Sequence, residues 1–405
     1  MQQVSEYLAG EAGEDVTVYT TFAYNTALFT DPGAPAMPGE RGEEEVNGVK
    51  VKRFPVQNRW GRFLYILQYI FYRLRLWGNG RLRMLYYGPI SSQLKKAIKE
   101  FSPDIIAAAP FPLNHINYVF KAGVPVVLIG CIHTADRHGF CNPRIAKQIK
   151  RAAGYIALTG HEKEYLVQRW GIDEKKIRVI GVGLNIEENS QKFFGGSRGA
   201  AFQKSPPGRR RHFCKTLGIP EDVPVIAFVG QHGLHKGIET LILAMGIVWV
   251  RFPGVRLIVA GGVSPFTESF KELARFMDGD GTRIFFLDNI DESVKEDILS
   301  GCDIFSTPSG FESFGITILE AWKWKRPVVA CRIAATMNLI EEYETGLLVD
   351  YKDARELAGA LCELLADPGL REAIGEKGFR KLVETYSRRV VGKQYHDFYR
   401  EVLGR

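Results

Sequence analysis

Two glutamates lie eight positions apart in the segment SGFESFGITILEAW, residues 309–322, directly after the apolar run DIFSTP. We expect Glu312 in a strand-to-helix turn and Glu320 about two helical turns further along. Carboxylates in such places can accept hydrogen bonds from hydroxyl groups. The alternative is that both are solvated residues at a helix end, which is the ordinary interpretation of an isolated pair of glutamates.

The residues between the two glutamates favour a binding site over that alternative. Gly315 permits a close backbone approach at the start of the helix. The N–H groups of Phe314, Gly315 and Ile316 would then be free to bind a phosphate, which the positive end of the helix dipole favours. A phosphate site between two carboxylates fits a sugar nucleotide, whose diphosphate has hydroxyl groups on either side.

The elements that position this segment belong to an α/β fold. Short apolar runs recur along the chain, separated by amphipathic stretches of helical length, and this alternation predicts parallel sheets with crossover helices. The runs are VTVYT (16–20), IIAAA (105–109), PVVLIG (125–130), YIALT (155–159), IRVIGV (177–182), PVIAFVG (224–230), VRLIVAG (255–261), RIFFL (283–287), DIFSTP (303–308) and PVVAC (327–331). The predicted class is α/β and doubly wound.

A segment rich in Gly, Ser, Pro and Arg, residues 188–213, predicts a linker between two lobes. The N-terminal lobe would span 1–187 and the C-terminal lobe 214–389, with a final helix, 390–405, as a candidate to pack back on the first lobe. The length of 405 residues suits two domains. Two such lobes predict an interdomain cleft, because ligands of open α/β sheets bind beyond the carboxyl ends of the strands.

The N-terminal lobe lacks the start that this architecture usually has. A doubly wound lobe begins with its central strand and a glycine-rich turn, whereas this chain opens with the helical pattern VSEYLAGEAG before VTVYT. We expect a gap in the sheet of this lobe if a first strand was lost through a truncated or misassigned start.

The C-terminal lobe resembles glycosyltransferase family 4, a retaining family with the GT-B fold of two Rossmann-like lobes. The resemblance rests on TPSGFESFGITILEAW followed by RPVVA, and on FVGQHGLHKG, RLIVAGG and ETGLLVD. In the N-terminal lobe a less specific match is carried by FSPDIIAA, GYIALTGHEKEYL and VIGVGLN. The resemblance implies an enzyme that transfers a sugar from a UDP- or GDP-linked donor held by the second lobe.

The resemblance also implies a role for each residue of the motif. Glu320 would hold the ribose hydroxyls, Glu312 would contact the transferred sugar, and the amides of residues 314–316 would bind the diphosphate. The backbone near Ile290, after the run RIFFLDNID, would meet the base.

The segment FVGQHGLHKG resembles the family's VGR-x-x-x-x-KG loop, whose Arg and Lys neutralise the leaving diphosphate. Lys236 stands at the position of the family's lysine. The alternative is that it is an ordinary exposed lysine of a loop. Gln231 stands at the arginine position, where it donates a hydrogen bond but carries no charge. This departure puts the turnover rate in question more than donor binding, because charge develops on the phosphate mainly as the glycosidic bond breaks.

Four histidines are candidates for the same site. His133, in LIGCIHTADRHG, resembles the family's donor-sugar contact, and His138 competes with it. His232 and His235 flank Lys236 and are expected at the surface, with phosphate contacts as the alternative.

No Asp-x-Asp pair and no clustered set of His, Asp and Glu suggests a divalent ion, so we expect neither metal nor cofactor. Lys236 and the helix N-terminus would take the place of a metal. The resemblance implies retention through a same-face displacement, in which the leaving phosphate helps to deprotonate the acceptor hydroxyl and no protein nucleophile is required.

The stretch 59–83 is aromatic and basic, with no acidic residue. Five of its apolar side chains fall on one helical face. They are Phe63, Leu67, Ile70, Leu74 and Trp77. Such a helix either covers the sheet of the N-terminal lobe or rests on an acidic membrane leaflet, where it would bring the lobe to a lipid-linked acceptor.

Composition narrows the partners and the location. The net charge of +7 suits anionic partners in general, and no feature points to nucleic acid. The chain has no long apolar run and no secretion signal at its start, so we expect it in the cytoplasm, with the inner face of the membrane as a further option. Its six scattered cysteines are expected to be reduced.

Three functions remain open on the sequence alone. The first is sugar transfer to a glycan, a lipid carrier or a small molecule. The second is a catalytically weak subunit that binds the donor, which Gln231 and the missing strand motivate. The third is the epimerase branch of the GT-B fold, against which the ESFG segment speaks.

Overall fold

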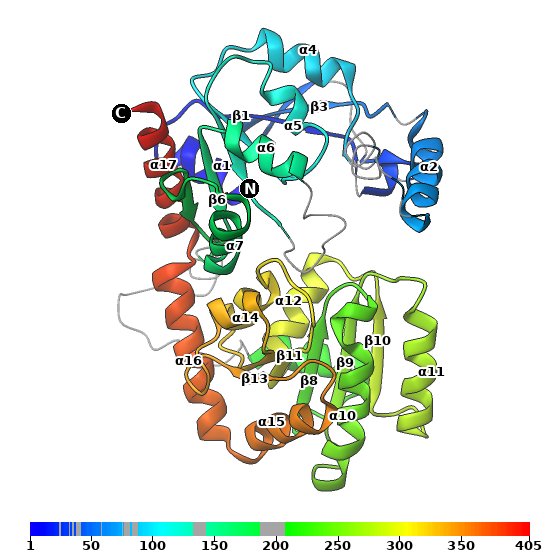
Figure 1. Cartoon of the computed structure of the whole chain (residues 1–405). Helices are drawn as coiled ribbons and strands as arrows, with labels where there is room; N and C mark the ends of the chain where they lie inside the picture. The colour runs from blue at the N-terminus through cyan, green and yellow to red at the C-terminus, as the bar shows by residue number, and fades with distance from the viewer. Residues whose placement is uncertain are drawn as a thin grey trace. The chain divides into compact units, whose positions relative to one another are not determined.

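The computed structural model divides the chain into two compact units. It describes residues 1–23, 26–31, 33–34, 36–37, 42–57, 59–74, 76, 82, 88–132, 143–186 and 207–405. Residues Met1–Gly183 together with Arg388–Arg405 form the N-terminal unit, and residues Leu184–Ser387 form the C-terminal unit (Figure 1). Each unit contains parallel sheet covered by helices.

The C-terminal unit is built on a six-stranded sheet in the order β10-β9-β8-β11-β12-β13, in which every pair of neighbours is parallel. The strands are β8 (Val225–Val229), β9 (Arg256–Gly261), β10 (Ile284–Asp288), β11 (Ile304–Thr307), β12 (Val328–Cys331) and β13 (Leu347–Val349). The four strands β8, β11, β12 and β13 are buried at every residue. Their continuous apolar runs therefore correspond to a sheet that is covered on both faces.

Helices follow the strands of this unit in alternation. They are α9 (Pro207–Leu217), α10 (Ile238–Arg251), α11 (Thr267–Asp278), α12 (Glu292–Gly301), α13 (Ile316–Lys323), α14 (Ala334–Leu339), α15 (Ala354–Ala366) and α16 (Pro368–Thr385), with the 3-10 turn η3 (Leu234–Lys236) before α10. Helix α9 begins inside the range 188–213 that the sequence suggested as a linker.

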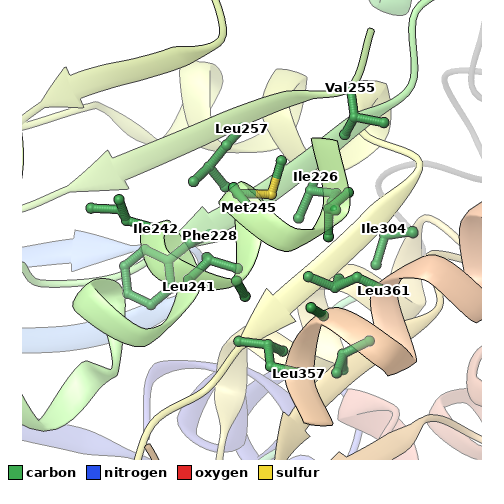
Figure 2. Close-up of a cluster of buried hydrophobic side chains, with 14 of the residues drawn as sticks. Ile226, Phe228, Leu241, Ile242, Met245, Val255, Leu257, Ile304, Leu357 and Leu361 are labelled. Atoms are coloured by element: carbon green, nitrogen blue, oxygen red, sulfur yellow. The ribbon is translucent and has the colours of Figure 1, made fainter. Parts of the chain in front are cut away.

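The core of the C-terminal unit lies between its sheet and two helices (Figure 2). Ile226 and Phe228 of β8 and Leu257 of β9 meet Leu241 of α10 and Leu361 of α15, and all five are fully buried. Burial of one such side chain contributes about 1.5–3 kcal/mol. This core fixes the strands whose ends carry the candidate site.

The N-terminal unit contains two sheets. Strands β1 (Thr17–Thr21), β3 (Val49–Phe54) and β2 (Glu43–Val46) form one, in the order β1-β3-β2, with a parallel β1–β3 pair and an antiparallel β2–β3 pair. Strands β4 (Ile106–Ala108), β5 (Val126–Ile129), β6 (Gly154–Ala157) and β7 (Ile177–Val179) form the other, which is parallel throughout. Among the residues that the structure describes, no strand joins the two sheets.

The last helix of the chain belongs to the N-terminal unit. The helices of this unit are α1 (Gln2–Gly10), α2 (Gly61–Arg73), α4 (Ser92–Glu100), α5 (Ile116–Val119), α6 (Pro143–Arg151), α7 (Gly160–Trp170) and α17 (Arg388–Leu403), with short 3-10 turns at Thr26–Phe29 and Glu174–Lys176. Tyr395 and Phe398 of α17 share a buried cluster with Val4 and Leu8 of α1. The two ends of the sequence therefore pack together in one unit.

Helix α2 exposes several of its apolar side chains, among them Phe63, Ile66 and Ile70, whereas Leu64, Leu67 and Phe71 are half-buried. Gly61 is its only buried residue, and a Cβ there would lie 2.4 Å from the Phe29 carbonyl oxygen, so the helix begins in close contact with the backbone before it. Within the described residues, no apolar side chain of α2 is fully buried, so the sheet-covering role considered from the sequence is at most partial. No helix in the described part of the chain combines the length and apolar character that crossing a membrane requires.

Candidate functional site

The candidate site lies at the carboxyl ends of β8 and β11, which are neighbours in the sheet of the C-terminal unit. The N–H of Gly310 donates to the carbonyl of His235 at 2.9 Å, so the loops after the two strands are joined. Gly237 has a positive φ of 70°, and a Cβ there would lie 2.0 Å from the Pro308 carbonyl oxygen. Only glycine fits this approach, which explains the KG pair at the end of the β8 loop.

Lys236 and Glu312 form an ion pair across these two loops. The Lys236 Nζ lies 2.5 Å from Glu312 Oε1, and the side chains are 19% and 16% exposed. The pair combines a cation that can bind a phosphate with a carboxylate that can bind a hydroxyl group. The two sequence-predicted residues therefore meet, although 76 positions separate them.

Helix α13 begins beside this pair. Gly315 is its N-cap with a left-handed φ of 99°, a conformation that a side chain would strain. Phe314 is buried, with its ring 5.7 Å from that of Tyr386, whereas Ile316 is exposed. The first N–H groups of a helix have no carbonyl partner within it, so the start of α13 offers donors to an anion.

Glu320 lies on α13 but faces a different lysine. Its Oε1 accepts from the Nζ of Lys295 on α12 at 2.7 Å, and Lys295 also pairs with Glu292 at 2.9 Å. Burial raises the pKa of Glu320, and the attraction of Lys295 opposes this rise without cancelling it. Sequence reasoning missed Lys295, because it belongs to no motif and is 25 positions from its partner.

The neighbouring loops place Gln231 and Ile290. Gln231 is exposed after β8, with its Cγ beside Gly262 of the β9 loop. Ile290 is half-buried after β10 and follows Asn289, whose N–H donates to the Gly261 carbonyl at 2.6 Å. Both therefore lie on loops at the carboxyl edge of the same sheet.

The histidines differ from the expectation in part. His232 is fully buried rather than at the surface, because its Nδ1 lies 3.2 Å from Thr267 Oγ1 and its ring packs edge-on against Phe286. His235 is exposed as expected. His133 and His138 lie outside the described residues.

A buried carboxyl group holds the backbone that leads to position 133. Glu162, at the start of α7, accepts from the Tyr155 hydroxyl at 2.6 Å and from the amides of Leu158 and Ile132 at 2.9 and 3.2 Å. Burial raises its pKa to about 7, against the effect of these three donors. Sequence reasoning missed this residue too, since its partners lie outside its own helix and one of them, Ile132, is 30 positions away.

The described residues include no group of three or more His, Cys, Asp and Glu side chains that could hold a metal ion. In this part of the chain, Lys236 and Lys295 pair with the two glutamates of the segment 309–322.

Two family profiles match the chain, one for each half. "Glycosyltransferase Family 4" matches residues 1–188 and "Glycosyl transferases group 1" matches residues 210–381. A curated relative, the D-inositol 3-phosphate glycosyltransferase of Corynebacterium glutamicum, is 30% identical over 60% of this chain and 56% of its own length. The chain spans about half the length of the curated relatives it matches.

Solved structures with the same fold cover more of the chain. The sucrose-phosphate synthase of Thermosynechococcus elongatus aligns with a TM-score of 0.71 and 20% identity over 100% of this chain and 92% of its own. Anabaena HepE in complex with UDP and glucose aligns with a TM-score of 0.67 and 19% identity, over 88% and 87%. At these identities the likeness concerns the fold, which is GT-B, as the sequence predicted.

Proposed function

We propose that this chain, which belongs to glycosyltransferase family 4 by the matches of its two halves, transfers a sugar from a UDP- or GDP-linked donor to an acceptor hydroxyl group. The observation that carries the proposal is the Lys236–Glu312 ion pair beside the start of α13. It joins a cation, a carboxylate and free helix amides at one sheet edge, as a sugar diphosphate requires.

An exchange of partners would couple the ion pair to donor binding. In the structure, Glu312 pairs with Lys236. The arriving diphosphate would bind Lys236 and the amides of Phe314, Gly315 and Ile316, which releases Glu312 to accept from a hydroxyl of the sugar. Glu320 would accept from the ribose hydroxyls, the backbone at Ile290 would meet the base, and Gln231 would donate to the phosphate. His133 is proposed to contact the sugar, as the family resemblance implies.

The proposed reaction retains the anomeric configuration and needs no metal. The bond between the anomeric carbon and the phosphate oxygen breaks, the acceptor oxygen forms the new bond on the same face, and its proton passes to the leaving phosphate. Lys236 and the dipole of α13 would stabilise the charge that develops on that phosphate.

The acceptor is proposed to be a glycan, a lipid-linked sugar or a small molecule. Because a structure of similar fold holds UDP and glucose, UDP-glucose is the first donor to test. D-inositol 3-phosphate, from the name of a relative, is a first acceptor to test. A donor-binding subunit with weak turnover is the second candidate, because Gln231 supplies no charge to the phosphate.

A thermal-shift screen of UDP- and GDP-sugars tests the donor proposal. A ligand at 100 times its Kd stabilises the folded state by about 2.7 kcal/mol. We expect at least one donor to raise the unfolding midpoint, and Glu320→Gln to weaken the shift. The control is Lys163→Met, which removes a lysine of the N-terminal unit from an ion pair with Glu174 of 2.7 Å. If no UDP- or GDP-compound shifts the midpoint, the proposal is wrong.

We propose that the protein is cytoplasmic and that helix α2 contacts the anionic inner face of the membrane. Trp60, Phe63 and Leu74 are 64%, 58% and 63% exposed at and around the helix. Arg62 and Arg73 are exposed on the same helix, and the stretch contains no acidic residue. Aromatic side chains with neighbouring arginines suit a leaflet of negative surface potential.

Flotation with vesicles tests this contact. We expect the protein to float with phosphatidylglycerol vesicles. It should be released at about 1 M salt, because salt screens surface charge. The double variant Phe63→Ser with Leu74→Ser should no longer float. Phe276→Ser is the control, since Phe276 is 84% exposed in the C-terminal unit. If the double variant floats as well as the wild type, these side chains do not contact the membrane, and the proposal for α2 is wrong.

A further inference from the structure

Lys295 is a half-buried cation next to the proposed ribose site and belongs to no recognised motif. It lies on α12, and its Nζ donates to Oε1 of Glu320 on α13 at 2.7 Å. The two side chains are 18% and 12% exposed. The pair thus joins two neighbouring helices in a setting where an unpaired charge is costly.

The surroundings of Glu320 act on its ionisation in opposite directions: burial and two carboxylates oppose it, and Lys295 favours it. Besides Lys295, the charged groups facing Glu320 are the carboxylates of Glu292 and Glu296, which raise its pKa further. Lys323, on the same helix as Glu320, is engaged by Glu296 at 2.8 Å. Among the described residues, Lys295 is the cation that the Glu320 carboxylate contacts.

The geometry leaves the carboxylate room for two further donors. An ionised carboxylate has about four acceptor positions. Lys295 occupies one of them on Oε1, and no hydrogen bond to Oε2 occurs within the described part of the chain. A ribose offers two hydroxyl donors, so it can bind without displacing Lys295. A protonated carboxyl group would instead present a donor of its own to the diol.

We propose that Lys295 is a positioning residue for the nucleotide, which keeps Glu320 ionised and oriented so that its carboxylate accepts from both ribose hydroxyls. This inference rests on the proposed function, which assigns the ribose to Glu320. The lysine acts through Glu320 and is not itself a catalytic residue.

The proposal has a signature in the pH dependence of binding. Without Lys295, burial and the two neighbouring glutamates raise the pKa of Glu320 further, so the carboxyl group takes up a proton at a higher pH than in the wild type. That proton must leave before the carboxylate can accept from ribose. Affinity then falls as the pH falls below that pKa, by about tenfold for each pH unit. A residue with only a structural role would change affinity by a constant factor at every pH.

The experiment measures the Kd of UDP, with GDP in parallel, by calorimetry between pH 6 and pH 8.5. We expect the Kd of the wild type, and that of Lys295→Arg, which keeps the charge, to change least with pH. For Lys295→Met we expect the ratio of the Kd at pH 6 to the Kd at pH 8.5 to be severalfold larger than in the wild type. Lys163→Met, the lysine control in the other unit, should match the wild type.

A double variant and a second ligand assign the effect to Glu320. Lys295→Met with Glu320→Gln contains no buried unpaired charge, so it should fold, bind weakly and have a flat profile. The 2′-deoxy form of the nucleotide should lose less affinity at low pH in Lys295→Met than the ribose form. A flat profile for Lys295→Met, or a slope that persists in the double variant, would overturn the inference. If the wild type binds neither UDP nor GDP, the proposed function is what fails.

Discussion

Each unit buries a glutamate near the carboxyl edge of its sheet, and the two are stabilised in different ways. Glu162 of the N-terminal unit is bonded by the Tyr155 hydroxyl and by two backbone amides. Glu320 of the C-terminal unit is bonded by the Lys295 ammonium group. Burial raises the pKa of both.

From this difference we expect a structural role for Glu162 and a ligand-binding role for Glu320. The bonds of Glu162 tie three local segments together and use both of its oxygens. Glu320 keeps acceptor positions open beside a cation, as Glu312 does beside Lys236. We therefore expect substitutions in the C-terminal pairs to change kinetics, and substitution of Glu162 to change stability.

The largest effect is expected at Lys236. Lys236→Ala should lower kcat by roughly 10²–10³, about 2.7–4 kcal/mol, because the lysine faces charge that grows as the diphosphate leaves. Steady-state hydrolysis or transfer with a nucleotide sugar gives kcat and the donor KM separately. When Gln231→Arg is added to Lys236→Ala, the loss of kcat should be smaller, because the new arginine supplies a cation to the same loop. A variant in which only KM changes would mean that Lys236 binds the ground state alone.

The next effect concerns the stability of the N-terminal unit. The pKa of Glu162 is raised in the folded state from 4.5 to about 7, so the folded protein binds the proton more tightly than the unfolded chain. Its stabilising contribution is thus full below about pH 4.5 and is lost as the pH rises through 7, a change of roughly 3 kcal/mol.

Urea unfolding at pH 5, 6, 7 and 8 measures this loss. The wild type should lose stability across the series, and Glu162→Gln should lose less while its donor KM stays unchanged. Glu100→Gln is the control, since Glu100 is exposed on α4 of the same unit. If the free energy of unfolding changes with pH by the same amount in the wild type and in Glu162→Gln, Glu162 does not cause the change. The proposed difference between the two glutamates would then be wrong.

The features that the sequence predicted are those carried by contiguous residues. Apolar runs of strand length predicted the α/β class, and the segment 309–322 led to Glu312 and Glu320. The pairing of Lys236 with Glu312 depends on β8 and β11 being neighbours in the sheet, which the structure shows.

The remaining features depend on contacts between segments far apart. Lys295 is 25 positions from Glu320, and Thr267 is 35 positions from His232, so local patterns carried no sign of either contact. A histidine in a polar loop suggested the surface, yet the hydroxyl of Thr267 allows His232 to be buried. Glu162 looked like an ordinary helical glutamate, because its partners come from other elements.

A smaller effect than that of Glu162 is expected for the ribose contact. Glu320→Ala should raise the donor KM by about 10- to 100-fold and leave kcat comparatively intact, because a hydrogen bond to a charged group contributes about 1.5–3 kcal/mol in ground and transition state alike. Glu320→Gln, which keeps the shape of the side chain, is the companion variant. If Glu320→Ala instead lowers kcat at constant KM, the roles proposed for Glu320 and Lys236 are exchanged.

The smallest effect, an unchanged rate, is expected from removal of metals. Transfer should continue in excess EDTA, since the proposed site binds the diphosphate through Lys236 and helix amides. Activity that disappears with EDTA and returns with Mn²⁺ would replace this part of the proposal by a metal-assisted mechanism.

The central claim is that the C-terminal unit binds the donor through the loops after β8 and β11. Hydrogen exchange measured with and without a saturating nucleotide sugar locates the ligand directly, because bound amides exchange more slowly. The account predicts protection of residues 230–237 and 309–322 in the wild type, and loss of that protection in Glu320→Ala at the same ligand concentration. Protection confined to the N-terminal unit, with these two segments unchanged, would contradict it.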